Sequence, residues 1–286
     1  MKRSLSLFAA LLALTVALPV LAAEVPWTSL PNVEVSKLDD DIKARAISLM
    51  KEEACYHECE DTVFNCVTQS KPSDTALRAA GFITRQVIKG KPNTQIHSEL
   101  MDRARSVHPF KTATFKGLRK SLMMGEAKAP VRIVVFADFD CPFCRVVSPM
   151  LRQMLPDFDG KVAYFFFFFP VKGHGPLAVE TSRAGIAAAD QKKFWEFHDI
   201  MYSNFEAHSE SEIEGYAQKL GLDLERFKKV WHHDKTLEVV SASKKEGLRL
   251  GVKSTPTIYI NGKRYFGEKT EVELRDRIEE EIALTN

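Results

Sequence analysis

The chain has 286 residues, which is enough for one large domain or two ordinary ones. Apolar residues make up 45% and charged residues 27%, so the composition is that of a globular protein and argues against a disordered or fibrous chain. Lys and Arg number 40 against 38 Asp and Glu, and two of these cations, Lys2 and Arg3, stand in the first segment. Without them the numbers of cationic and anionic residues are equal. The net charge therefore gives no reason to expect nucleic acid or an anionic membrane as a partner.

The first 22 residues have the layout of a secretory signal peptide. Two cations precede an apolar run at 5–20, and Ala22 and Ala23 supply small residues for cleavage. An uncleaved anchor is the alternative, because the run approaches the roughly 20 residues that a bilayer needs, but Pro19 and the alanines favour cleavage. We therefore expect residues 1–22 to be removed and the mature protein to be exported, soluble and periplasmic, where cysteines can be oxidised.

Residues 23–125 are predicted to form an all-helical N-terminal domain. Apolar residues recur at helical spacing in four stretches, residues 42–50, 77–87, 96–107 and 115–122. Ser73 is placed to cap the second of these helices, and Gly90 to end it. Such helices could serve as a dimerisation module, so a homo-oligomer formed through this region is one expected assembly.

Three cysteines, Cys55, Cys59 and Cys66, fall within this helical region. Cys55 and Cys59 are four residues apart and would share one face of a helix, whereas Cys59 and Cys66 could bridge across a turn. Three interpretations stay open. One is a structural disulfide plus one remaining thiol, which an exported location favours; another is a dithiol that exchanges with a second cysteine pair; the third is metal capture together with His57.

A charged linker at 125–130 separates this helical region from a stretch with a different pattern of apolar residues. Residues 131–137 and 162–169 are apolar runs rich in β-branched or aromatic residues, and neither alternates cleanly with polar residues. Such runs are typical of central strands covered on both faces. Residues 142–155 between them have the length of a helix, so the three segments predict a βαβ unit with parallel strands.

The rest of the chain is predicted to contain a helical insert, a hairpin and a last helix. Residues 176–250 return to helical spacing, interrupted by turn-forming residues. Asn261-Gly262 lies between two short strand-like runs, a pattern typical of a two-residue hairpin turn. Residues 271–284 have a helical pattern, which completes a predicted α/β domain over residues 126–286.

Cys141 and Cys144 stand where the first predicted strand is followed by a helix. A thiol at a helix N-terminus faces unsatisfied N–H groups and the positive end of the dipole, which lower its pKa from about 8.5 into the range of about 3.5 to 7.5. Pro142 is tolerated there because a first-turn residue needs no N–H partner. Cys144, one turn further on, can attack a mixed disulfide formed at Cys141, and Pro142 and Phe143 are expected to tune the redox potential.

Two other interpretations of this pair are weaker. A zinc site needs a second pair of ligands, and residues 145–286 contain no cysteine and no histidines at ligand spacing. An inert structural disulfide seldom places one sulfur at an exposed helix start. The pattern in this context therefore favours redox chemistry.

Residues 131–145, VRIVVFADFDCPFCR, together with Ser254-Thr-Pro-Thr257 and Asn261-Gly262, resemble the DsbA-like branch of the thioredoxin superfamily. The helical stretch at about 176–250 is similar to the helical insert of that branch. The resemblance covers residues 126–286. It implies an α/β thioredoxin fold with an inserted helical subdomain, here preceded by the all-α N-terminal region.

The resemblance also implies further site residues. Thr255 and Pro256 would be joined by a cis peptide bond packed against the cysteine pair, and the Thr255 backbone would offer hydrogen bonds to an extended substrate. The family commonly has a buried acid six residues before the nucleophile, where this chain has Val135. Asp138 or Asp140 would replace that acid, or would be polar residues where the strand ends.

We predict an exported thiol–disulfide oxidoreductase that exchanges disulfides with protein substrates through Cys141 and Cys144. No organic cofactor is expected, because the pair stores two electrons, and a membrane or soluble redox partner would recycle it; no nucleic acid is expected. The direction of exchange, as oxidase, reductase or isomerase, stays open. One alternative is an exported protein that binds a soft metal such as Cu(I). The other is a thiol protein of cytochrome c maturation, because residues 73–105 faintly resemble the helical hairpin of such proteins.

Overall fold

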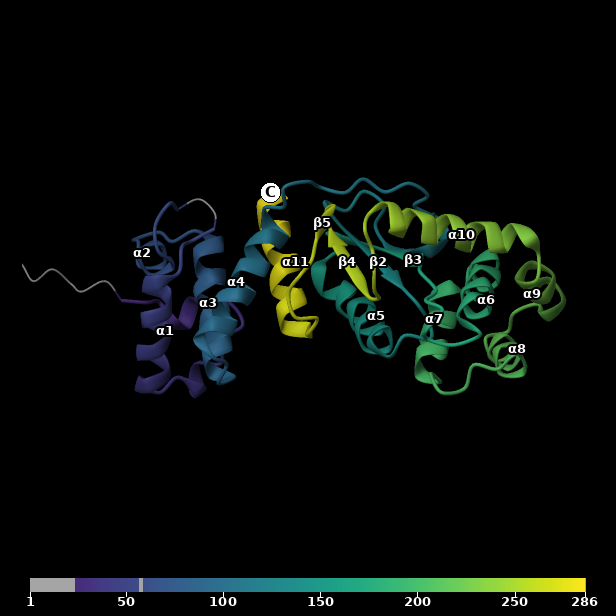
Figure 1. The fold of residues 1–286 in the computed structure, drawn as a ribbon, viewed down its shortest axis with the longest axis horizontal. Helices are drawn as coiled ribbons and strands as arrows, with labels where there is room; N and C mark the ends of the chain where they lie inside the picture. Colours follow the sequence, from purple (N-terminus) through teal and green to yellow (C-terminus); the bar gives the residue numbers. More distant parts are fainter. Residues whose placement is uncertain (1–23, 57–58, 286) are drawn as a thin grey trace, which may run out of the picture.

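The computed structural model describes residues 24–56 and 59–285. The predicted signal peptide lies outside the described residues, as does His57. The chain is elongated, with a helical N-terminal region at one end, a sheet in the middle and a second group of helices at the other end (Figure 1).

The N-terminal region packs four helices around one apolar cluster. Three of them begin at capping residues: Asp39 accepts from the backbone N–H of Ile42 at 2.7 Å, Thr62 from that of Asn65 at 3.2 Å, and Ser73 from that of Ala76 at 3.1 Å. Ala46, Leu49, Ile83 and Leu100 are among the residues buried between the helices. The elements are η1 (Trp27–Ser29), η2 (Val35–Lys37), α1 (Asp40–Glu52), α2 (Val63–Val67), α3 (Asp74–Ile88) and α4 (Asn93–Val107).

The second region is built on a five-stranded sheet in the order β1-β3-β2-β4-β5. Strands β2 and β3 are parallel, as the predicted βαβ unit requires, and the other pairs are antiparallel. The hairpin turn has positive φ at Asn261 (48°) and Gly262 (78°), which a two-residue turn of this kind needs. The strands are β1 (Met123–Gly125), β2 (Val131–Ala137), β3 (Val162–Phe168), β4 (Thr257–Ile260) and β5 (Lys263–Arg264).

Both faces of the central strands are covered, which explains why their sequences do not alternate. Val135 and Phe166 lie in the apolar cluster that contains both cysteines of the C-x-x-C motif. Val134 and Phe167 lie in a second cluster on the opposite face, against the segment that leads to β1. The first face is covered by α5 (Pro142–Met154), which is followed by η4 (Leu155–Phe158), together with helices of the insert and the last helix.

A group of five helices is inserted between β3 and β4, in agreement with the predicted insert. Ser209 and Glu212 form a capping box at the start of one of them. The longest helix of the group, α10, returns along the sheet and packs Gly247 against Phe169 (Figure 1). The helices are α6 (Ala178–Asp190), α7 (Phe194–Ser203), α8 (Glu210–Lys219), α9 (Leu224–Trp231) and α10 (Asp234–Arg249).

The helix predicted at 115–122 is wrong. Residues 108–119 form an extended connection, followed by the short η3 (Lys120–Leu122) and by β1. Phe115 and Leu118 of this segment pack against the sheet, and the ring of Phe115 lies 5.3 Å from that of Tyr259. The boundary expected at residue 125 is therefore too late in the chain, because β1 already pairs with β3.

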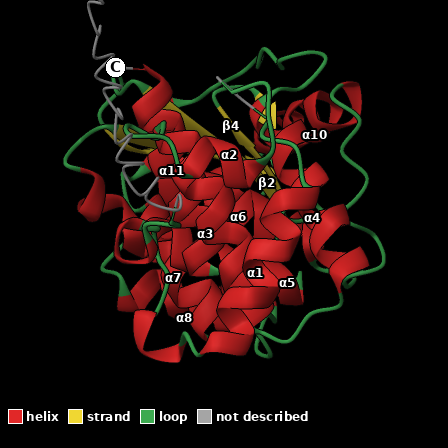
Figure 2. Cartoon of the chain, turned by 90° about the vertical axis from the view of Figure 1, so that its left-hand side faces the viewer, coloured by secondary structure: helices red, strands yellow, loops and turns green. Residues whose placement is uncertain are grey.

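The last helix, α11 (Glu271–Thr285), joins the two regions through buried charges. Its Asp276 has no exposed surface and accepts hydrogen bonds from Arg78, Arg85 and Arg103 at 2.7, 3.0 and 2.7 Å. These arginines belong to α3 and α4, so the N-terminal region is fixed against α11. Figure 2, which faces the N-terminal end, shows α1 and α3 in front of α5 and the strands.

Candidate active site

The C-x-x-C motif occupies the start of α5, directly after the end of β2. Cys141 is the N-cap residue, with an extended backbone (φ −92°, ψ 120°), and Pro142 is the first helical residue. The carbonyl of Asp138 accepts from the N–H of Cys141 at 3.2 Å and so fixes the turn between strand and helix. Phe143 is 71% exposed and lies beside the buried pair as an apolar surface.

The turn before β4 covers the sulfur of Cys141. The Thr255–Pro256 peptide bond is cis, and the Cys141 sulfur lies 3.3 Å from the carbonyl oxygen of Thr255, to which it donates when it is protonated. This contact places the sulfur against the Thr255–Pro256 turn, 114 residues further along the chain. Cys141 itself has no exposed surface, which differs from the exposed helix start that the sequence suggested.

The two thiols have opposite acidities. A hydrogen bond from Cys144, assisted by the Thr255 side chain and the N–H groups of Phe143 and Cys144, lowers the pKa of Cys141 to about 5, although burial opposes this. Burial raises the pKa of Cys144 well above its usual value, and the neighbouring Cys141 adds to this effect. At neutral pH the pair therefore consists of a thiolate at Cys141 and a protonated thiol at Cys144.

Val135 occupies the position where the family's buried acid is expected, and it is part of the apolar cluster around the pair. Asp138 is fully buried, and this burial raises its pKa. Its carboxylate accepts from the N–H of Val171 and contacts the ring of His174, both at 2.8 Å. The backbone N–H of Asp138 interacts with the sulfur of Cys144, so this residue adjoins the pair.

Asp140 is held by the helical insert. One carboxylate oxygen lies 2.6 Å from Nδ1 of His208, and the other accepts from the hydroxyl of Thr181 at 3.3 Å. The second ring nitrogen of His208 lies 2.9 Å from the carbonyl of Met201, so both nitrogens face acceptors, which suits the doubly protonated ring. Burial opposes protonation, but Asp140 and the Met201 carbonyl outweigh it and raise the pKa of His208.

Sequence reasoning missed His208 and Tyr202, whose hydroxyl donates to the carbonyl of Asp138 at 3.2 Å. No local signal could have found them, because they lie 64 and 58 residues beyond Cys144 and reach the motif only through the packing of α7 and the loop after it. His174 was visible only as a histidine after a strand. The structure places it against Asp138.

The upstream cysteines belong to the N-terminal region, whose helices lie on the far side of α11 from the sheet (Figure 1). Cys59 and Cys66 form a disulfide with a Cα–Cα distance of 6.0 Å. Cys55 is outside this disulfide and half-buried at the edge of the helical cluster. Within residues 24–56 and 59–285, no three His, Cys, Asp or Glu side chains are grouped so that they could hold a metal ion.

Fold and site together define a class of protein, the thioredoxin-fold proteins that carry a C-x-x-C pair at a helix start. The thioredoxin family matches residues 118–280, which is more than half of this chain, and the chain belongs to that family. The match begins before the domain boundary that the sequence pattern predicted at residue 125, in keeping with the place of β1 in the sheet.

Solved structures with a similar fold include BdbD from Bacillus subtilis, with a TM-score of 0.52, 22% identity, and coverage of 60% of this chain and all of that one. The catalytic domain of Proteus mirabilis ScsC has a TM-score of 0.51 and 18% identity, covering 65% of this chain and 98% of that one. The thiol-disulfide exchange protein α-DsbA2 from Wolbachia pipientis has a TM-score of 0.50 and 21% identity, covering 64% of this chain and 94% of that one. At these identities the likeness is one of fold.

Curated relatives by sequence include two Na⁺/H⁺ antiporters. The NhaA 1 protein of Salinispora arenicola is 35% identical over 144 residues, and NhaA of Herminiimonas arsenicoxydans is 30% identical over 143. Each alignment covers 50% of this chain but 22% of the antiporter, so the chain spans less than a quarter of the length of these relatives. Among the residues that the structure describes, no helix has both the length and the apolar character to cross a bilayer.

Proposed function

We propose that the protein is an exported oxidoreductase that exchanges disulfides with protein substrates through Cys141 and Cys144. The single observation that supports this most is the acidic sulfur of Cys141, held at the start of α5 with a pKa of about 5 beside the protonated thiol of Cys144. A thiolate is the attacking species in disulfide exchange, and a neighbouring thiol is needed to release the substrate.

In the reductive direction, the Cys141 thiolate attacks one sulfur of a substrate disulfide. A bond forms between the two sulfurs, the substrate disulfide breaks, and the other substrate sulfur leaves as a thiolate that takes up a proton. Cys144 then loses its proton and attacks the sulfur of Cys141. This closes the Cys141–Cys144 disulfide and releases the second substrate thiol, so the substrate gains two electrons and the pair loses two. Oxidation of a substrate dithiol is the same sequence in reverse.

The acidity of Cys141 favours the oxidising direction. A stabilised thiolate stabilises the reduced pair, which makes the disulfide form a stronger oxidant. A pKa of about 5 lies between the values of about 7 for thioredoxin and about 3.5 for DsbA. We therefore propose net transfer of disulfides to substrates, with recycling of the reduced pair by a membrane or soluble redox partner and without an organic cofactor.

The surface around the pair suits an extended polypeptide. Phe143 and Val146 are 71% and 63% exposed on the first turns of α5, the helix whose N-cap Cys141 contacts the Thr255–Pro256 turn. Large apolar side chains exposed in a group are typical of surfaces that bind other proteins. The backbone of Thr255 would pair with the substrate chain there. Export through cleavage of residues 1–22 would place this surface among unfolded client proteins in an oxidising compartment.

The test is trapping with the Cys144→Ala variant, with Cys141→Ser as its control. The first variant should accumulate mixed disulfides with client and recycling proteins, and the control should accumulate none. The redox potential measured against glutathione should lie above about −230 mV; a value nearer −270 mV would mean a reductase. Stoichiometric metal that is lost in Cys141→Ser, together with no trapped protein, would contradict the proposed function and favour a soft-metal binding protein.

A further inference from the structure

The extended segment 108–119 carries a surface that the thiol chemistry does not use. Two cavities of about 700 and 420 Å³ flank it, and Arg249 lines both. In Figure 1 the segment runs along the upper edge of the molecule, from the end of α4 over the sheet and beside α10. We call the residues that line the two cavities the basic–aromatic face.

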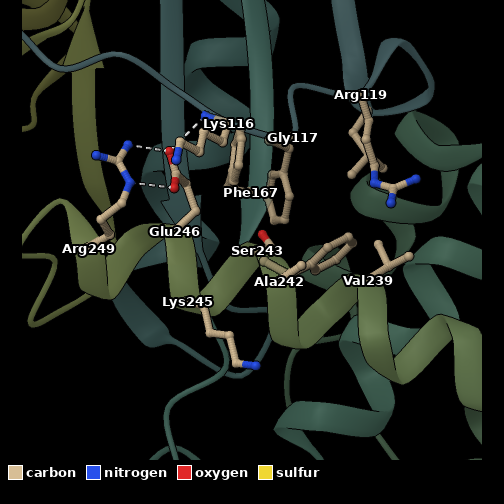
Figure 3. Close-up of a pocket in the computed structure, with 13 residues that line it drawn as sticks. Lys116, Gly117, Arg119, Phe167, Val239, Ala242, Ser243, Lys245, Glu246 and Arg249 are labelled. Carbon is tan, nitrogen blue, oxygen red and sulfur yellow. Dashed lines mark hydrogen bonds and ion pairs between the residues drawn. The ribbon is translucent and has the colours of Figure 1, made fainter.

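Basic side chains dominate this face. Among the described residues that line the two cavities, Glu246 is the single acid, and it already accepts from Arg249 and from the backbone N–H of Lys116 (Figure 3). The basic residues are Arg105, Lys111, Lys116, Arg119, Lys245, Arg249 and Arg264, joined by His108. The neutral balance of the whole mature chain therefore conceals a local excess of positive charge.

Several of these cations have no partner of opposite charge among the residues that the structure describes. Lys111, Arg119 and Lys245 are exposed and form no ion pair with any residue in the described ranges. In Figure 3, Arg119 and Lys245 point away from Glu246 in different directions. Charges that spread in this way meet an extended anionic surface better than one small anion, because their fields do not converge on one point.

The same face exposes large apolar side chains. The ring of Phe110 is fully exposed, at 110% of its reference area, and Phe110 is one of the residues that line the larger cavity. Phe266 is 41% exposed, with the guanidinium groups of Arg105 and Arg264 at 5.0 and 5.4 Å from its ring centre. A fully exposed phenylalanine contributes nothing to the core, and its burial elsewhere would be favourable.

We propose that the basic–aromatic face docks on an anionic lipid bilayer. Aromatic rings favour the boundary between headgroups and acyl chains, and Lys and Arg are drawn to the negative surface potential of anionic lipids. Phe110 enters that boundary, and the unpaired cations meet lipid phosphates on both sides of the segment. An acidic polypeptide without apolar side chains would satisfy the charges, but it would not bury the fully exposed ring.

The docked orientation leaves the cysteine pair accessible. The segment covers the sheet face that carries Val134 and Phe167, whereas Cys141 and Cys144 belong to the cluster on the opposite face. A protein held by the basic–aromatic face thus presents Cys141 away from the lipid. In this orientation the protein would exchange disulfides with substrates beside a membrane, and this use rests on the proposed function. The docking itself does not rest on it.

The experiment measures co-sedimentation of the full mature chain with vesicles of phosphatidylcholine containing 0 or 30% phosphatidylglycerol. Binding should require the anionic lipid and should weaken as salt rises toward 0.5 M. Phe110→Ser combined with Lys111→Gln should lower the partition coefficient at least tenfold, of which about fivefold comes from the lost charge. Val35→Ser combined with Lys37→Gln, an exposed apolar and cationic pair in the N-terminal region, is the matched control and should bind as the wild type does.

Three results would overturn the proposal: no binding to anionic vesicles, binding that the Phe110 and Lys111 changes leave intact, or binding of soluble polyglutamate by a protein that ignores vesicles. The last would assign the face to an acidic polypeptide. Alkylation of Cys141 in the docking variant separates this question from the proposed function. Loss of docking in the variant with a normal Cys141 reaction confirms the proposal, whereas an unreactive Cys141 in a wild-type protein that still docks contradicts the proposed function alone.

Discussion

Replacing Cys144 with alanine should raise the pKa of Cys141 from about 5 to about 6 or 7. The hydrogen bond from Cys144 is the largest of the causes that lower the pKa of Cys141. A hydrogen bond to a charged group is worth about 1.5–3 kcal/mol, and about 1.4 kcal/mol corresponds to one pKa unit, which gives an increase of about 1 to 2. The remaining N–H groups at the start of α5 keep the value below the ordinary 8.5 or so of a free cysteine.

The measurement is the thiolate absorbance near 240 nm, followed from pH 3 to 10 in the reduced protein. Cys144→Ser keeps a hydrogen-bond donor at the same place, so Cys141 should titrate in it within about half a pKa unit of the wild type. If Cys144→Ala also titrates near 5, the helix start alone sets the acidity and the role given to Cys144 is wrong. A wild-type value near 8.5 would refute the whole argument for an activated thiolate.

The same pKa makes the stability of the reduced protein depend on pH. The pKa of Cys141 is lower in the folded state than in the unfolded chain, so its ionisation stabilises the fold fully above about pH 8.5, and this contribution is lost as pH falls through about 5. At pH 7 the expected contribution is about 3 kcal/mol, because the pH lies about two units above the pKa of Cys141 in the folded state and each unit corresponds to about 1.4 kcal/mol. Denaturant unfolding of reduced wild type and Cys141→Ser at pH 7 and pH 4 measures it; a difference that does not shrink at pH 4 would contradict it.

Asp276→Ala should lower the free energy of unfolding by about 3–5 kcal/mol, because it leaves three buried arginines without their shared acceptor, whereas Glu279→Gln, at the half-exposed end of the same cluster, should cost less than about 1. Burial alone would raise the pKa of Asp276, but the arginines outweigh it and lower the pKa, so this stabilisation should be lost in the wild type as pH falls below about 4. Gly247→Ala places a methyl group 2.6 Å from the ring of Phe169 and should destabilise by about 1–3 kcal/mol, whereas Gly215→Ala, which meets nothing within 4 Å, should stabilise by a few tenths to about 1. Urea unfolding at several pH values checks all of these, and equal effects within either pair would contradict the packing described.

The elements that local pattern determines were predictable from the sequence. The runs around Val134 and Phe166 predicted two central strands, because strands covered on both faces carry few polar residues. Asn261-Gly262 predicted its turn, because both residues accept positive φ at little cost. Cys141 and Pro142 marked the start of α5 by helix-end chemistry that operates within a few residues.

Features created by distant contacts were not predictable. The spacing of Phe115, Leu118 and Leu122 fits a helix, but these residues also fit one face of a sheet, and the decision comes from strands that lie far along the chain. Nothing near Asp276 in the sequence shows that it will accept from arginines about 170 to 200 residues away. The link between His208 and Asp140 arises in the same way, from the docking of the insert.

With valine at position 135, another group must accept the proton of Cys144, and Asp138 is the better placed of the two nearby acids. Its burial raises its pKa, and its backbone contacts the sulfur of Cys144, whereas the carboxylate of Asp140 is occupied by His208 and Thr181. Asp138→Asn should therefore slow the release of a trapped mixed disulfide by about tenfold to a hundredfold at neutral pH and flatten its pH dependence. Asp140→Asn, the matched change two residues on, should leave the release rate within about twofold, and stopped-flow tryptophan fluorescence follows both reactions. Equal slowing in the two variants would mean that both act by supporting the turn before Cys141, and that water accepts the proton directly.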